Sequence, residues 1–452
     1  MKNSSIKDTL HSMSKNKEKA IPKSRISRFG RVARMAGGVA AGMLGEGAKQ
    51  LAKGNRPKMS DLILTPNNAR RVAKQLSAMR GAAMKVGQLL SMESAEFLPP
   101  ELSKILGQLR DKAFIMPRHQ LVQSLVESYG DNWQEQFQSF SYQPLAAASI
   151  GQVHRATTHD GSEIVLKIQY PGVAQSIDSD VDNIASLLKV SRLLPSHMDI
   201  STLLVDAKAQ LHEEANYEQE LAYLQKFQST LGSDKRFIVP KAYPELSTKT
   251  ILAMDYVGGV PVDSITEIAP SKIDELMENL FALMLSELFE IRLMQTDPNF
   301  ANYLYQEESG KIVLLDFGAT RKFTKKFATD YKRMIRGVVA QDRELTLDAA
   351  DRLGYVASQA SEEYQDFLVE IFNIALESFQ EKGTYDFENA RLSERIAELS
   401  EQVYGYKEFW QTPPTSVLYL HRKLGGMFLL ATRLGAQVNV NKMVEPYIAT
   451  LK

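Results

Sequence analysis

The sequence predicts an α+β fold with a helical extension in front, a small lobe that contains β-strands, and a larger helical lobe. Apolar residues recur at helical spacing within residues 66–130 and again from Ile273 onward. Between these helical parts lie short segments rich in β-branched or alternating apolar residues, at 147–156, 164–169 and 250–256. A long helical stretch at 173–231 separates the second of these strands from the third. The order of the elements therefore indicates two lobes behind an added front end.

Composition places the chain among ordinary globular proteins. Its 452 residues are enough for two or three domains, and 44% hydrophobic with 24% charged residues is typical of a soluble fold. The formal net charge is zero, which argues against a nucleic-acid partner. The chain has no cysteine, which excludes disulfides, thiolate catalysis and cysteine-based zinc sites. A reducing compartment fits this composition.

Charge and glycine content mark the first part of the chain. Residues 1–35 hold ten Lys and Arg against Asp8 and Glu18, a net charge of about +8 that is typical of a disordered basic arm. Eleven uncharged, glycine-rich residues follow at 35–45, and a helix that spans a membrane needs roughly 20. Small residues four apart let helices approach closely. Two interpretations stay open: a membrane-surface or homodimer-forming helix, and a solvated tail with a loosened helix.

Composition shifts and proline breaks divide the rest. Pro99-Pro100 interrupts the front helices, and the character of the sequence changes near residue 144. We expect a basic arm and Gly-rich helix at 1–59, a helical extension at 60–140, a strand-containing lobe with a helical insertion at 141–257, and a helical lobe at 258–452.

Two short polar motifs carry the chemistry. Asp297 precedes Asn302 by five residues, and Asp316-Phe317-Gly318 follows at the end of an apolar run. Protein kinases place a catalytic aspartate five residues before a metal-binding asparagine, and then use an Asp-Phe-Gly aspartate for Mg²⁺. The lobes predicted above fit a protein-kinase-like bilobal fold. The usual His-Arg before the catalytic aspartate is Gln295-Thr296 here.

The nucleotide-binding parts of a kinase lie upstream in the expected order. The glycine-rich template G-x-G-x-x-G-x-V fits 146–153 with its first two glycines replaced by alanine. Lys167 follows Val153 by fourteen residues inside an apolar strand, where an ammonium group needs a partner. The nucleotide-binding candidates are therefore Ala146, Ala147, Ala148, Ser149, Gly151, Val153 and Lys167.

Two departures from the kinase pattern change the expected chemistry. Alanine removes the easy access to positive φ that glycine has, so the phosphate loop should be stiffer. No Ala-Pro-Glu follows Asp316, and residues 319–336 run quickly into helix. The segment that docks peptide substrates is therefore missing, and phosphorylation of other proteins is not expected.

These residues resemble the UbiB family of atypical kinases, also called aarF-domain-containing kinases, and most closely its mitochondrial coenzyme Q kinase-like ATPases. The likeness covers roughly residues 60–450. Lys85-Val86-Gly87-Gln88 matches the family's Lys-x-Gly-Gln signature, and 146–149 its alanine-rich loop. Segments 167–173, 294–302 and 315–321 match its strand-lysine, catalytic and metal loops.

The resemblance implies roles for further residues. Glu220 matches the helix glutamate that pairs with the strand lysine. The family's Glu-x-Asp motif falls on Glu214 and Asn216, so a charge is lost at the second position. Lys85 and Gln88 would point into the active site where a protein substrate would otherwise bind. The resemblance also implies ATPase behaviour, association with lipids, and support of ubiquinone biosynthesis.

The sequence thus predicts an ATP-binding, Mg²⁺-dependent atypical kinase or ATPase. Lys167 and Glu220 would orient the α/β-phosphates, Asn302 and Asp316 would hold Mg²⁺, Asp297 would position or deprotonate the acceptor, and Lys85 with Gln88 would gate the acceptor side. A kinase for a prenyl-quinone intermediate or lipid head group is one alternative, and a nucleotide-sensing scaffold or chaperone of a lipid-biosynthetic complex is another. The bacterial UbiB proteins of this family carry C-terminal transmembrane helices, but no run of about 18 apolar residues occurs here. We therefore expect a cytoplasmic protein peripheral to the inner membrane, with the mitochondrial matrix face as the alternative.

Overall fold

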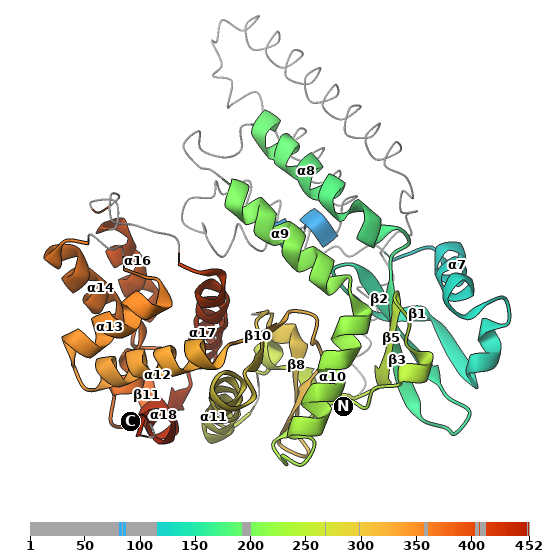
Figure 1. The fold of residues 1–452 in the computed structure, drawn as a ribbon. Helices are drawn as coiled ribbons and strands as arrows, with labels where there is room; N and C mark the ends of the chain where they lie inside the picture. The colour runs from blue at the N-terminus through green and yellow to red at the C-terminus, as the bar shows by residue number, and fades with distance from the viewer. Residues whose placement is uncertain are drawn as a thin grey trace, which may run out of the picture. The chain divides into compact units, whose positions relative to one another are not determined.

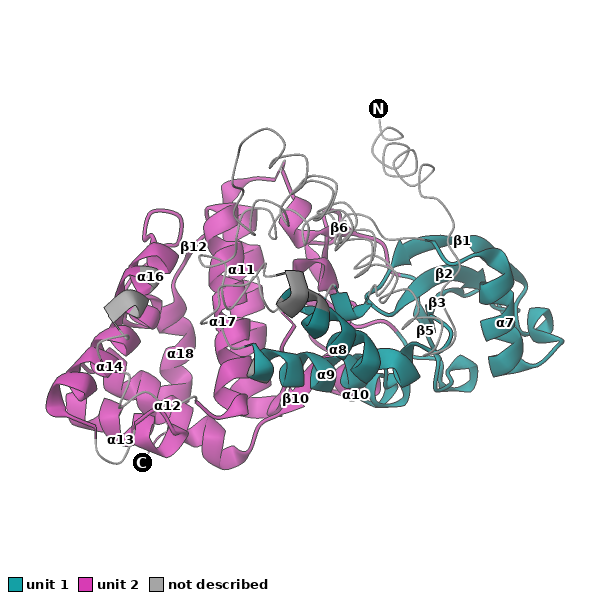
Figure 2. Cartoon of the chain, turned by 90° about the horizontal axis from the view of Figure 1, so that it is seen from above, with its two compact units in different colours: residues 1–222, 241–256 teal, residues 223–240, 257–452 magenta. Residues whose placement is uncertain are grey.

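A computed structural model gives the fold of most of the chain. The described residues are 81–83, 85–86, 115–191, 200–266, 268–297, 299–356, 360–402, 406, 413–449 and 451. The predicted basic arm and Gly-rich helix at 1–59 lie outside them, as do Gln88 and most of the helical extension. Figure 2 colours the two compact units of the chain. Unit 1 comprises residues 1–222 and 241–256, and unit 2 comprises 223–240 and 257–452.

Unit 1 is built on a four-stranded antiparallel sheet. The strands in spatial order are β1 (Ser139–Ala147), β2 (Gly151–Thr157), β3 (Glu163–Gln169) and β5 (Ile251–Asp255). Gly161 at positive φ lies in the turn between β2 and β3, where glycine is tolerated without strain. In the ladder Val153 faces Lys167, and Lys167 faces Leu252. Lys167 therefore lies in the interior of the sheet, with strands on both sides.

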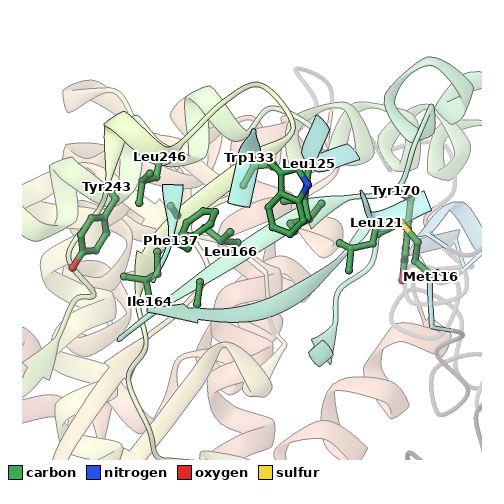
Figure 3. Close-up of a cluster of buried hydrophobic side chains, with 14 residues drawn as sticks. Met116, Leu121, Leu125, Trp133, Phe137, Ile164, Leu166, Tyr170, Tyr243 and Leu246 are labelled. Carbon is green, nitrogen blue, oxygen red and sulfur yellow. The ribbon is translucent and has the colours of Figure 1, made fainter. Parts of the chain in front are cut away.

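One face of this sheet is covered by α7 (Arg118–Tyr129) and the short helix η1 (Trp133–Gln136). Figure 3 shows the buried cluster at this face, which includes Leu121 and Leu125 of α7, Trp133 of η1 and Leu166 of β3. Burial of these large apolar side chains contributes about 1.5–3 kcal/mol for each. Strand positions 164, 166 and 168 enter this core, so Lys167 points to the opposite face of the sheet.

The helical insertion follows β3. It consists of α8 (Val173–Ser191), α9 (Ser201–Glu214) and α10 (Tyr217–Leu231). Helices α8 and α9 run side by side (Figure 1) and are linked by an ion pair between Lys208 and Asp182. Only two residues separate α9 from α10, so their adjoining ends are held close together.

In unit 2, a long α-helix that ends in a π-helical turn precedes the catalytic loop. Helix α11 (Pro270–Ser286) continues as the π-helix η4 (Glu287–Ile291), and Arg292 then adopts a left-handed conformation with φ 55°. Strand β7 (Leu293–Gln295) follows and pairs with β10 (Thr320–Lys322). A second sheet has the order β4 (Phe237–Ile238), β9 (Lys311–Leu314), β8 (Tyr303–Gln306) and β6 (Val260–Pro261).

The remainder of unit 2 is mainly helical (Figure 1). Its helices are α12 (Lys325–Val339), α13 (Arg343–Leu353), α14 (Glu362–Ala375), α15 (Glu377–Gln380), α16 (Leu392–Gln402), α17 (Thr415–Leu434) and α18 (Val440–Ala449). Thr324, Asp342 and Ser361 cap the first three of these helices through their side-chain oxygens. Strands β11 (Tyr385–Asp386) and β12 (Gln437–Val438) pair to complete the unit.

The described part of the chain has the α+β composition that the sequence predicts. The predicted strand at 147–156 is two strands, because residues 148–150 form a turn between β1 and β2. The quick return to helix after Asp316 is confirmed, since α12 begins at Lys325. Within the described residues, no helix combines the length and apolar character that crossing a membrane requires.

Candidate functional site

The residues proposed for nucleotide and metal binding fall into two groups, one in each unit. In unit 1, β3 and α10 bring Lys167 and Glu220 together. The ammonium of Lys167 donates to both carboxylate oxygens of Glu220, at 2.8 and 3.0 Å. The side chain of Lys167 is 11% exposed and that of Glu220 is 1% exposed. The structure therefore brings the strand lysine and the helix glutamate together across 53 residues of sequence.

The ring of Tyr217 forms the other side of this lysine site. Tyr217 lies one helical turn before Glu220 on α10, and its ring centroid is 5.2 Å from the Lys167 ammonium. An aromatic face attracts a cation and excludes water. Sequence motifs do not single out Tyr217, but its position three residues before the helix glutamate could have indicated it.

A second ion pair connects the helical extension to α9. Lys85 donates to Glu214 Oε1 at 2.6 Å, and its side chain is buried. The hydroxyl of Ser149, from the alanine-rich segment, donates to the other oxygen of Glu214 at 2.5 Å. Glu214 thus accepts from two proposed site residues that lie 129 and 65 positions away from it. The structure excludes a solvent-facing position for Lys85.

The extension also touches the alanine-rich segment through its backbone. A Cβ atom added to Gly81 would lie 2.7 Å from the carbonyl oxygen of Ser149 and 2.9 Å from Cγ2 of Ile150. Such distances are shorter than real contacts of Cβ atoms, so a side chain at this position would force the two segments apart. Glycine at position 81 therefore permits the close approach that Lys85 and Ser149 need to share Glu214.

The alanine-rich segment is partly strand. Ala146 and Ala147 end β1 and pair with Val153 and Gln152 of β2, while the amide of Ala148 donates to the carbonyl of Gly151 at 2.9 Å. Alanine favours negative φ, so the ladder extends further than two glycines would allow. A Cβ on Gly151 would lie 2.4 Å from the carbonyl oxygen of Ile168, which explains the glycine there.

Asn216 has a local structural role that explains the altered acidic motif. It lies between α9 and α10, and its Oδ1 accepts the amide of Gln219 at 3.0 Å. Its carbonyl oxygen accepts the amide of Glu220. Asparagine and aspartate are about equally good at this N-terminal capping position. The change from the family aspartate therefore keeps the cap of the helix that carries Glu220.

In unit 2, strand pairing brings the two polar loops together. Strands β8 and β9 are antiparallel, with Tyr303 facing Leu314, so Asn302 and Leu315 are neighbours. The Leu315 amide donates to the Asn302 carbonyl at 3.0 Å. Within the first loop, Asn302 Nδ2 donates to Asp297 Oδ2 at 3.1 Å. The structure therefore brings the side chains of Asp297 and Asn302 together.

The loop that carries Asp316 is ordered by its own backbone and by the first loop. Asp316 Oδ1 accepts the amide of Gly318 at 2.9 Å. Phe317 is buried, and its ring lies 5.1 Å from that of Phe227. Thr296, at the position of the usual kinase arginine, donates its hydroxyl to the carbonyl of Ala319 at 2.8 Å. No sequence motif indicates a role for Thr296, yet its hydrogen bond connects one loop to the other.

The donor set suits Mg²⁺ bound together with a nucleotide. Asn302 turns its amide nitrogen to Asp297, which directs its amide oxygen away from that carboxylate. Carboxylate and amide oxygens are ligands that Mg²⁺ prefers, and it usually combines one or two of them with waters and phosphate oxygens. Among the described residues, no cluster of three or more His, Asp or Glu could hold a metal by itself. Asn302 and Asp316 thus offer ligand atoms of the kind that Mg²⁺ combines with phosphate oxygens.

A model of the ABC1 atypical kinase-like domain matches residues 108–349. The chain belongs to the ABC1 family. This family assignment confirms the UbiB resemblance drawn from the motifs. The atypical kinase COQ8, mitochondrial, of Saccharomyces cerevisiae is 36% identical over 450 residues, which cover 98% of this chain and 87% of the relative. The mitochondrial atypical kinase COQ8B of Rattus norvegicus is 37% identical over 94% of this chain and 80% of its own length.

A solved structure shares the fold of this ABC1 protein. The complex of Rv3197 with erythromycin from Mycobacterium tuberculosis aligns with a TM-score of 0.58 at 22% sequence identity, over 84% of this chain and 95% of that one. The likeness supports the kinase-like α+β fold. The interpretation of the chain as an atypical kinase-like enzyme is confirmed as well.

Proposed function

We propose that this ABC1 protein is a Mg²⁺-dependent ATPase of the atypical kinase type that supports ubiquinone biosynthesis or lipid homeostasis. The observation that carries the proposal is the pairing of Lys167 with Glu220, because a kinase-like phosphate site requires a strand lysine held by a helix glutamate. The identity to relatives named mitochondrial atypical kinase COQ8 supports the link to quinone biosynthesis.

Each proposed role follows from the chemistry of the residue. Lys167 would contact the α/β-phosphates while Glu220 orients its ammonium, and residues 146–153 would cover the phosphates. Asn302 and Asp316 would hold Mg²⁺, which when bound neutralises charge on the phosphate oxygens. Asp297 would position or deprotonate the acceptor, either water or a small molecule. Lys85 and Gln88 would limit access from the acceptor side, and the ion pair of Lys85 with Glu214 supports that role.

The proposed partners and location rest on charge. The basic arm at 1–35 would bind an anionic membrane surface, and the Gly-rich segment behind it would support a homodimer. A lipid or prenyl-quinone intermediate would be the second partner beside ATP. A nucleic-acid partner is not expected, because the net charge of the chain is zero. We propose a cytoplasmic protein peripheral to the inner membrane, and the mitochondrial matrix face is the alternative that the names of the relatives support.

The test is phosphate release from ATP by the purified chain with Mg²⁺. Asp316→Asn should lower turnover on the order of 100-fold or more, because it removes a charged metal ligand. Asp351→Asn, at an exposed position of α13, is the matched control and should leave turnover unchanged. Nucleotide binding without turnover, even with lipid vesicles present, would overturn the ATPase and favour a nucleotide-sensing scaffold. A phosphorylated lipid or quinone precursor detected by mass spectrometry would favour a small-molecule kinase.

A further inference from the structure

Behind the catalytic loop of unit 2 lies a buried group of three polar side chains from distant parts of the chain. Lys423 of α17 donates to the hydroxyl of Tyr303 in β8 at 2.6 Å. The same ammonium lies 3.5 Å from Oε2 of Glu287 in the π-helix η4. The side chains of Lys423 and Glu287 are 5% and 2% exposed. Charges this far from water are costly unless they are paired, so each charge in this group needs a partner.

The charge balance of the group is internal. Burial alone would lower the pKa of Lys423, but Glu287 and Tyr303 outweigh burial and raise it above its usual value. The lysine therefore stays charged. Burial raises the pKa of Glu287, and the charge of Lys423 beside it opposes that shift. Neither side chain belongs to the nucleotide-binding or metal-binding candidates.

The three side chains form hydrogen bonds at both ends of the catalytic loop. At its start, Glu287 Oε1 accepts the backbone amide of Gln295, two residues before Asp297, at 3.4 Å. At its end, Tyr303 follows Asn302 directly and is held by Lys423. Through Lys423 and Glu287, the two ends of the loop therefore share one buried ion pair.

Helix α17 makes a parallel contact with the second loop. Tyr419 lies four residues before Lys423, on the same face of the helix. Arg321, three residues beyond Gly318, donates to the Tyr419 hydroxyl at 2.7 Å and lies over its ring at 4.1 Å. One face of α17 thus supports both loops, although the helix lies outside residues 108–349 that match the ABC1 domain.

We propose that Lys423, Glu287 and Tyr303 are positioning residues that hold Asp297 and Asn302 in their metal-binding geometry. The proposal rests on the Mg²⁺–nucleotide function proposed above. The three residues do not touch nucleotide or metal; they fix the loop that does. Loss of the Lys423–Tyr303 hydrogen bond would let the 295–303 segment open and separate Asp297 from Asn302.

The test compares Tyr303→Phe with Tyr355→Phe. The Tyr355 hydroxyl contacts His421 at 2.5 Å, on the opposite side of α17 from Tyr419 and Lys423, so each variant removes one tyrosine hydroxyl bond to the same helix. In nucleotide-free protein, Tyr303→Phe should raise hydrogen exchange of the 295–303 amides about tenfold, as expected for the loss of a hydrogen bond to a charged group. With ATP, the Mg²⁺ concentration for half-maximal binding should rise by a similar factor. Tyr355→Phe should change neither.

Equal hydrogen exchange of the 295–303 amides and equal Mg²⁺ dependence in the two variants would overturn the proposal. A purely structural role would lower the stability of both variants, but it would change neither the exchange of these amides nor the Mg²⁺ dependence selectively in Tyr303→Phe. Hydrogen exchange needs no nucleotide, so it decides the positioning role even if the wild-type chain binds no ATP. If Tyr303→Phe does not fold, Lys423→Arg keeps the charge and displaces the donor. Exchange of the 295–303 amides at the wild-type rate in that variant would then contradict the proposal.

Discussion

Two lysine–glutamate pairs, one in each unit, differ in how their charges are satisfied. In unit 1, Lys167 donates to both oxygens of Glu220 at 2.8 and 3.0 Å, and the lysine keeps 11% of its surface exposed. In unit 2, the Lys423 ammonium lies 3.5 Å from Glu287 Oε2, donates its short hydrogen bond to the hydroxyl of Tyr303, and is almost completely enclosed. The first cation remains within reach of a ligand, whereas the second does not.

This difference in exposure and bonding indicates a different role for each pair. A close, two-oxygen pair near solvent orients an ammonium and still lets phosphate oxygens compete for it. An enclosed pair contributes little net stability by forming, but breaking it leaves one charge buried without compensation. We therefore expect the unit 1 pair to affect binding and the unit 2 pair to affect the integrity of its surroundings.

The largest effect is expected from Lys423→Met. It leaves Glu287 buried without its cation, which typically costs about 3–5 kcal/mol. Native-state hydrogen exchange of the α11 and α17 amides measures the loss within unit 2. Adding Glu287→Gln should recover part of the stability, since it removes the uncompensated charge. Lys272→Met is the matched control, because Lys272 and Glu275 form an exposed pair on α11 whose loss should leave the stability almost unchanged.

A smaller effect is expected from Glu220→Gln. The amide keeps the shape of the side chain but weakens a charged hydrogen bond, which is worth about 1.5–3 kcal/mol. The partial exposure of Lys167 allows water to replace some of the lost interaction, so the cost should be below that of Lys423→Met. Denaturant unfolding with and without Mg²⁺–ATP measures it, and Glu218→Gln at an exposed position of α10 is the control. A loss as large as that of Lys423→Met would mean that the partial exposure of Lys167 does not offset the loss of its partner.

The smallest effect is expected from Gly81→Ala. The added methyl meets the Ser149 carbonyl, which overpacks the contact by about 1–3 kcal/mol, while alanine improves helix propensity by about 1 kcal/mol. A net loss near 1 kcal/mol should appear as faster hydrogen exchange of the Gly151 amide and its neighbours. Gly425→Ala in α17 is the control, since nothing lies within 4 Å of its added Cβ, and it should be neutral or stabilising. A gain in stability in both variants would mean that the extension does not pack closely against the alanine-rich segment.

Motif spacing was enough to predict the parts of the site that follow from kinase-like patterns. An interior strand lysine must be paired, and the family pattern indicated Glu220 as its partner. The thirteen residues between Asn302 and Asp316 form a hairpin, so both ends meet by strand pairing alone. Local strand pairing determines the second of these features, whereas the partner in the first rests on the family resemblance.

Contacts between distant segments could not be predicted in the same way. Nothing in the local pattern around Glu214 shows that it accepts from both Lys85 and Ser149. The pairing of Lys423 with Glu287 could not be predicted from the sequence either, because the two residues lie 136 positions apart, in α17 and in the π-helix η4. Such pairs are selected by tertiary packing, and single-sequence patterns report only the face on which a residue lies.

Because residues Glu287–Ile291 form a π-helix, the position of the catalytic loop depends on how many residues this turn contains as well as on which residues they are. An α-helix advances about 100° for each residue, so deleting one residue from 288–291 would rotate all that follows by about that angle. The Gln295 amide would then turn away from Glu287 even though both residues were still present. Length variation at this one turn is therefore expected to be less tolerated than most substitutions within it.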